Sequence, residues 1–201
     1  MRFHVCATPE QVSQAQTLRY EVYCKEKGWV RPPSSGSLCE VDESDERAVH
    51  FLAVNHAGSA VGTARYLLGW EQELPASRYL DTVALGLKPR DVTEVSRLAI
   101  DRAERSQDLL VFLGLTRLMW HWGMENSVKS WCAVADVPLY KLLTRLRIPV
   151  LATGGPVDYM GSECMPVAYD MPGSGAALYR RLHEQPDPDA LHREFVEASG
   201  L

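Results

Sequence analysis

The sequence lacks the marks of several protein classes. Its five cysteines stand at positions 6, 24, 39, 132 and 164. They include no CxxC pair, so the pattern favours reduced thiols over a disulfide framework or a zinc site. The longest mostly apolar run, residues 109–122, is too short and too polar to cross a bilayer, and Met1–Glu10 has no apolar centre of the kind found in signal peptides. We therefore expect a cytoplasmic protein with no metal site.

Basic residues are in the minority as well. Lys and Arg number 21 against 26 Asp and Glu, a formal net charge of −5, which argues against nucleic acid as the main partner. The 201 residues suit one domain with an appended tail, since a domain usually has roughly 100–200 residues. We predict one domain over residues 1–172 and a C-terminal helical tail over residues 173–201.

The hydrophobic pattern alternates between strands and helices. It predicts strands at residues 3–7, 49–54, 60–68, 93–100, 128–134, 150–153 and 165–170. It predicts helices at residues 10–27, 107–123, 138–146, 176–184 and 191–198. Thr8 and Asp136 are predicted N-caps, and residues 55–59 are predicted to form a hairpin turn. The strands on either side of the second helix are predicted to be parallel and joined by a right-handed crossover. The fold class is α/β, a mixed twisted sheet with helices on both faces.

Two charged residues, Glu94 and Arg97, lie in the apolar strand at residues 93–100. Strict alternation places Glu94, Ser96 and Leu98 on one face and Arg97 on the other, unless a bulge intervenes. Burying a lone charge is very costly. The strand therefore contains either a structural ion pair, or an edge with one wet face, or a catalytic carboxylate held by arginines.

A run of acidic residues, Glu40–Glu46, precedes the predicted hairpin. Such a run is often a solvated surface. Alternatively, Asp42 and Asp45 are close enough in sequence to converge on one arginine, for which Arg19 and Arg65 are the candidates. A guanidinium can bind a carboxylate in a bidentate way, because it donates two parallel hydrogen bonds.

The loop at residues 101–108 is polar, contains Arg102 and Arg105, and leads into the second helix. A helix N-terminus binds phosphate well, but a loop without glycine cannot wrap a diphosphate closely. We therefore expect either a site for a single phosphate, or a charged turn in which the acidic residues of the loop neutralise its arginines. Lys129, Lys141, Arg145 and Arg147 are expected to extend this basic rim. The aromatic residues around Trp131 indicate either core or an apolar tunnel for a chain.

Six segments carry a family resemblance: Leu18–Tyr23, Gly28–Trp29, Glu40–Asp45, His50–Ala53, Gly62–Arg65 and Glu94–Ala99. In order and spacing they resemble the autoinducer-synthase-like branch of the GCN5-related N-acyltransferases, over about residues 3–170. Within that branch the chain is most similar to the long-chain N-acyl amino acid synthases and the exosortase-associated acyltransferases. Acyl-homoserine lactone synthases usually have Phe at the positions of Tyr23 and Leu98, so both residues depart from their pattern.

The resemblance implies an N-acyltransferase that moves a long-chain acyl group from acyl carrier protein to the amine of a free amino acid, with tyrosine as the favoured acceptor. It implies no permanently bound cofactor, the phosphopantetheine arm as donor, and a lipid product that allows loose membrane association. The alternatives are an acyl-homoserine lactone synthase that uses S-adenosylmethionine, and a non-catalytic acyl-binding or sensor module.

The resemblance also implies roles for individual residues. The amine must lose a proton before it attacks, and the expected catalytic residues are Glu94 as the base, Arg97 and Ser96. Backbone N–H groups around residues 98–100 are the expected oxyanion donors. The expected substrate-binding residues are Arg19, Trp29, Asp42, Asp45, Arg65, Leu98 and Trp131, and Arg102 and Arg105 are expected to bind the phosphopantetheine phosphate.

Overall fold

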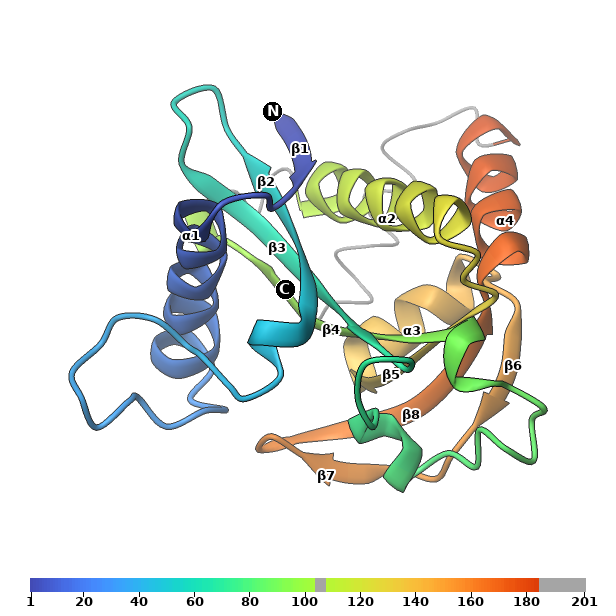
Figure 1. The fold of residues 1–201 in the computed structure, drawn as a ribbon. Coiled ribbons are helices and arrows are strands. Elements are labelled where there is room, and N and C mark those ends of the chain that lie inside the picture. Colours follow the sequence, from blue (N-terminus) through green and yellow to red (C-terminus); the bar gives the residue numbers. More distant parts are fainter. Residues whose placement is uncertain (104–107, 185–201) are drawn as a thin grey trace.

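A mixed eight-stranded sheet with helices on both faces forms the protein (Figure 1), which confirms the predicted fold class. The computed structural model describes residues 1–103 and 108–184, with side chains up to residue 177. The strands are β1 (Arg2–Val5), β2 (Ala48–Val54), β3 (Ala60–Leu68), β4 (Val92–Ile100), β5 (Ser130–Asp136), β6 (Val150–Thr153), β7 (Val157–Tyr159) and β8 (Ser162–Asp170). Their order is β1-β2-β3-β4-β5-β8-β6, and β7 pairs with β8.

The helices lie on opposite faces of this sheet (Figure 1). They are α1 (Pro9–Arg19), the π-helix η1 (Tyr20–Glu26), α2 (Asp108–Glu125), α3 (Val137–Arg145) and α4 (Met171–Glu184), with short 3₁₀ turns η2 (Asp45–Arg47), η3 (Pro75–Arg78) and η4 (Pro89–Asp91). Ala15 of α1 packs on Leu52 and Val54 of β2, whereas α2 packs on the other face, where Gly62 allows a close approach because a Cβ would overlap Val111. Among the described residues, no helix is long and apolar enough to span a bilayer.

Local sequence signals explain where the elements begin. Thr8 caps α1 in a capping box with Gln11, and Asp136 Oδ1 accepts the backbone N–H of Leu139 at 3.1 Å to cap α3. In the β2–β3 turn, Asn55 Oδ1 accepts the N–H groups of Ala57 and Ser59. These observations confirm both predicted caps and the predicted hairpin.

Strands β4 and β5 are parallel, as predicted, but they pair over only three positions. The last pair is Glu94 with Cys132, after which the strands separate although both continue. On its far side β5 pairs with β8 along its whole length. The split therefore opens beside the part of β4 that contains the predicted catalytic residues.

Several predicted boundaries are wrong. The helix predicted over residues 10–27 is regular only to Arg19 and continues as the π-helix η1, in which the N–H of Lys27 bonds to the carbonyl of Val22. Strand β7 was not predicted, and β8 begins earlier than expected because the two form a tight hairpin. Helix α4 begins at Met171, so it runs across the predicted boundary at residues 172/173; the division into domain and tail stays a prediction, and the predicted helix at 191–198 lies outside the described residues.

Candidate active site

A β-bulge reorganises β4 in the middle of its sequence motif. The pairing with β3 shifts by one residue between Thr63↔Ala99 and Arg65↔Ser96, and Arg97 has a φ of 53°. This bulge is the exception that the predicted faces allowed for, so Leu98 does not share a face with Ser96 as strict alternation would require. Arg97 reaches the same acidic loop as Arg65, whereas Leu98 packs into the core on the other face.

Three arginines and three carboxylates form what we call the charged cluster: Arg19, Arg65, Arg97, Glu40, Asp42 and Asp45. Arg65 Nη1 lies 2.7 Å from Asp42 Oδ1 and 2.6 Å from Asp45 Oδ1, so both carboxylates converge on one arginine, as predicted. Arg19 forms a bidentate pair with Asp45, and the side chain of Arg19 is 0% exposed. The acidic run is thus an internal ion network in part, while Glu43 and Glu46 are exposed.

Glu40 is the cluster member for which no role was predicted from the sequence. It is buried, and it accepts hydrogen bonds from both Arg19 and Arg97. Arg97 also donates to Asp42 Oδ2 at 2.8 Å. Glu40 and Asp42 therefore hold the bulge of β4 in place through Arg97. The only sequence signal for the role of Glu40 is that it lies two residues before Asp42 in an acidic run.

The cluster favours the ionised forms of Asp42 and Asp45. Burial opposes ionisation, yet the hydrogen bonds and charges of Arg19 and Arg65 hold the pKa of Asp45 well below its usual range. Burial likewise acts against Asp42, whose pKa is lowered by Arg65 and Arg97. Since three positive charges face three negative ones, the cluster is formally neutral.

Glu94 lies in a different environment, although it belongs to the same strand. Its side chain is 2% exposed, and its Oε2 accepts the backbone N–H of Ala76 at 2.8 Å. Within the described part of the chain no arginine comes within ion-pair distance of it, so the expectation that arginines hold this carboxylate directly is wrong. Burial raises the pKa of Glu94 to about 7, and the longer-range charges of Arg65 and Arg97 only partly oppose this.

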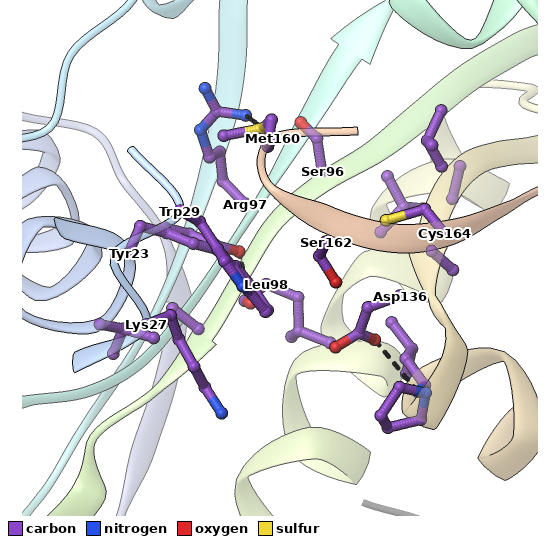
Figure 2. A pocket seen from close by; sticks show the side chains of 18 of the residues that line it. Tyr23, Lys27, Trp29, Ser96, Arg97, Leu98, Asp136, Met160, Ser162 and Cys164 are labelled. Atoms are coloured by element: carbon purple, nitrogen blue, oxygen red, sulfur yellow. Dashed lines mark hydrogen bonds between the residues drawn. The ribbon is translucent and has the colours of Figure 1, made fainter. Parts of the chain in front are cut away.

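A cavity of about 260 Å³ fills the split between β4 and β5 (Figure 2). Its wall includes residues 94–100 of β4 and residues 133–136 of β5. Much of the wall is apolar, with Phe112, Leu139 and Leu142 on the helix side. Of the predicted site residues, Glu94, Ser96, Arg97, Leu98 and Trp29 line it. Such a partly apolar cavity beside a carboxylate of raised pKa is typical of a catalytic site.

The β7–β8 hairpin closes one side of this cavity, and sequence reasoning missed it. At the tip of the hairpin, Met160 Sδ lies 3.2 Å from Arg97 Nη1. The next residue, Gly161, lies against the backbone of Trp29. Tyr159 and Ser162 line the cavity from the same hairpin. Burial, aided by the negative charge of Glu94, raises the pKa of Tyr159. The alternation of Val157 and Tyr159 before a glycine could have indicated the hairpin.

Other predicted residues lie elsewhere. Trp131 does not line the cavity but packs in the core, with its ring centroid 6.3 Å from that of Tyr66, so the tunnel interpretation of this residue is wrong. Arg102 is exposed just beyond the end of β4, and Arg105 lies outside the described residues. Lys129 does not extend their rim, because it pairs with Asp91 before the start of β5, at the opposite end of the strand pair.

Metal binding has no support in the described residues, which contain no group of three or more His, Cys, Asp or Glu arranged to hold an ion.

Comparisons with known proteins show similar folds. Residues 18–115 match the acetyltransferase (GNAT) domain family. TofI, solved in a ternary complex with an inhibitor and MTA, has a TM-score of 0.70 and 20% identity, and the match covers 89% of this chain and 97% of that one. FeeM, an N-acyl amino acid synthase from uncultured soil microbes, has a TM-score of 0.68 and 15% identity, with 90% and 97% covered.

A third structure is similar over the same region. BjaI, a CoA-dependent acyl-homoserine lactone synthase solved with SAM and isopentyl-CoA, has a TM-score of 0.68 and 21% identity, with 92% of each chain covered. A search of the curated proteins found no match. The structural likeness confirms the predicted fold, and the resemblance to the autoinducer-synthase-like branch fits these neighbours.

Proposed function

We propose that this chain is an acyltransferase that moves a long-chain acyl group from acyl carrier protein to the amine of a free amino acid. The match of residues 18–115 to the acetyltransferase (GNAT) domain family and the fold shared with TofI and FeeM support this proposal. The observation that carries this proposal is Glu94, a buried carboxylate at a cavity in the split sheet that has no ionic partner in residues 1–103 and 108–184. Burial raises the pKa of Glu94 to about 7, which suits a base that works near neutral pH.

The reaction follows from this placement. Glu94 takes a proton from the acceptor ammonium, directly or through water, and the neutral amine attacks the thioester carbon. A C–N bond forms, the C–S bond breaks, and the leaving thiolate takes up the proton that the attacking nitrogen loses. Past Glu94, β5 no longer pairs with β4, so N–H groups of β4 that point toward the split are available to the oxyanion. The cluster holds Arg97 and thereby this bulged backbone.

The donor end of the site supports a phosphopantetheine thioester. The largely apolar wall of the cavity suits an acyl chain. Arg102 at the end of β4 and Lys27, which lines the cavity, offer cations for one phosphate, and Arg105 stays a predicted contact. The loop at 101–108 has no glycine with which to enclose a diphosphate. Because BjaI is CoA-dependent, acyl-CoA is the donor to compare.

The acceptor end lies beside Glu94. Tyr79 and Tyr159 form an edge-on aromatic pair with centroids 6.1 Å apart, and Tyr159 lines the cavity. An aromatic wall near the base supports an amino acid with an aromatic side chain, and tyrosine remains the favoured acceptor. We place the reaction in the cytoplasm, with loose membrane association through the lipid product.

A second candidate is acyl-homoserine lactone synthesis from S-adenosylmethionine, which the likeness to BjaI favours. Mass spectrometry of lipids from a host expressing the chain separates the two. We expect N-acyl amino acids with the parent, and none with Glu94→Gln. Acyl-homoserine lactones would establish the alternative. If the protein instead keeps its function in Glu94→Gln, that function does not depend on a base, and this outcome would indicate the non-catalytic acyl-binding or sensor module.

A further inference from the structure

Two polar side chains stand out in the apolar part of the cavity. Asp136 ends β5 and Ser162 begins β8, and both line the cavity. Figure 2 shows the two side chains close to each other and near Leu98. Their neighbours on the wall include Ala135, Leu139 and Leu142. A carboxylate in such surroundings needs a hydrogen-bond donor, because burying a charged group without one is costly.

Only half of the Asp136 carboxylate is used within the protein. Oδ1 caps α3, as described above. Oδ2 accepts no hydrogen bond from the part of the chain that the structure describes. Burial raises the pKa of Asp136, and the nearby charge of Lys27 only partly offsets this. The Ser162 hydroxyl makes a long contact, 3.5 Å to the carbonyl of Glu163, and also interacts with the Cys164 thiol. Asp136 Oδ2 is therefore available to a ligand, and so is part of the bonding capacity of the Ser162 hydroxyl, which can donate one hydrogen bond and accept two.

The position along β5 indicates which part of a ligand they meet. Cys132 lies opposite Glu94, and Asp136 is four residues further on, or about 13 Å at the rise of a strand. In an extended pantetheine arm, three successive bonds span about the length of one residue in a strand, so we use three bonds as one unit of length. Its inner amide lies about one such unit from the sulfur, and its outer amide and hydroxyl two to three units from it. The amine nitrogen and the thioester carbon, which lie between Glu94 and the sulfur, add about one unit more, so the outer amide and hydroxyl lie about three to four units from Glu94, as Asp136 does.

We propose that Asp136 Oδ2, assisted by Ser162, accepts a hydrogen bond from the outer half of the pantetheine arm, at its outer amide N–H or its hydroxyl. Asp136 is then a positioning residue that fixes how far the donor enters the split. The inference rests on the proposed thioester donor.

The test compares two donors with the same saturated acyl chain. Acyl phosphopantetheine contains the outer amide and hydroxyl, whereas the acyl thioester of N-acetylcysteamine has only the inner amide. The variant is Asp136→Asn, because Asn caps a helix as well as Asp does and one oxygen is retained for Leu139. The matched control is Asp170→Asn, since Asp170 Oδ2 accepts the N–H of Gly173 at 2.7 Å near the start of α4, away from the cavity.

We expect Asp136→Asn to raise KM for acyl phosphopantetheine about tenfold, the scale of a hydrogen bond to a charged group. Its kcat should change less than twofold, and both parameters for the N-acetylcysteamine thioester should match the parent. Asp170→Asn should resemble the parent with both donors. Equal effects of Asp136→Asn on the two donors, or none on either, would overturn the proposal.

A binding measurement separates this proposal from the proposed function. Calorimetry with the stable S-alkyl phosphopantetheine thioether, which cannot transfer its chain, should show about tenfold weaker binding to Asp136→Asn than to the parent. A parent that binds the thioether in this way but transfers nothing would refute the transferase function and leave the subsite supported. Equal binding by parent and variant would refute the subsite whatever the activity.

Discussion

The carboxylates around β4 occupy two different environments. In the charged cluster, Asp45 is held by Arg19 and Arg65 in direct ion pairs. Among the residues that the structure describes, Glu94 of β4 has only the N–H of Ala76 as a hydrogen-bond partner. Both are buried, at 8% and 2% exposed. The difference shows that the pairing of a buried carboxylate, and not its burial alone, decides whether it is available for chemistry.

This difference appears as opposite dependences on pH. Despite its burial, the paired arginines lower the pKa of Asp45, so its contribution to stability is present above its unfolded pKa of about 4 and is lost as pH falls through the lower folded value. Burial raises the pKa of Glu94 to about 7, so its contribution is present below its unfolded pKa of about 4.3 and is lost as pH rises through 7. One group is fixed as an anion, whereas the other changes its charge near neutrality.

Removing Asp45 should have the largest effect. Asp45→Ala leaves two buried arginines short of a partner, so we expect the free energy of unfolding to fall by about 3–5 kcal/mol. The exposed neighbour Glu46 is the control, and Glu46→Ala should change it by no more than about 0.5 kcal/mol. Urea denaturation of both variants measures this, and a similar small change in the two would mean that the network is solvated in practice.

Glu94→Gln should separate activity from stability. Gln keeps the shape and can still accept the N–H of Ala76, but it cannot take a proton. We expect kcat to fall by roughly 10² or more, the usual scale for loss of a general base. The urea midpoint of the variant near neutral pH should stay close to that of the parent. Turnover within twofold of the parent would remove Glu94 from the mechanism.

The bulge itself can be loosened by one hydroxyl. Tyr23 Oη donates to the carbonyl of Leu98 at 2.7 Å, so Tyr23→Phe should lower the free energy of unfolding by about 0.5–1.5 kcal/mol. Tyr20→Phe is the control, since Tyr20 is also buried and its hydroxyl makes no hydrogen bond within the described residues. Equal effects in the two variants would show that the hydroxyl does not hold the bulge.

Arg102 should contribute least, and only to the encounter with the carrier. Arg102→Glu is expected to raise KM for acyl carrier protein several-fold, with no change in Tm, because an exposed charge acts mainly on association. Salt at about 0.5 M should weaken the parent more than the variant, as the Debye length shortens. A KM that is insensitive both to salt and to this change would argue against electrostatic docking at this end of the sheet.

The predictable parts of the fold were those with local signals. The Thr8 and Asp136 caps, the Asn55 turn and the parallel β4–β5 pair each follow from short-range patterns or chain topology. The motif of β4 indicated Glu94 and Arg97 correctly as unusual charges in an apolar strand.

The missed parts depend on contacts that are distant in sequence. The bulge contains no glycine, and Arg97 is held at its positive φ by Glu40 and Asp42, 57 and 55 residues away. The β7–β8 hairpin turns at Met160, whose positive φ is unusual for that residue type and which contacts Arg97 across 63 residues. Alternation along a single strand cannot reveal such tertiary partners.

The central claim is that Glu94 acts as a base because none of the described residues forms an ion pair with it, and the pH dependence of kcat tests this most directly. With saturating acyl donor and amino acid, the parent should lose activity on the acid side with an apparent pKa near 7, falling about tenfold per pH unit below it, since only the ionised carboxylate accepts a proton. In Glu94→Gln that limb should be absent from the residual activity. A parent profile that is flat from pH 5 to 8, or the same limb in Glu94→Gln, would contradict the account.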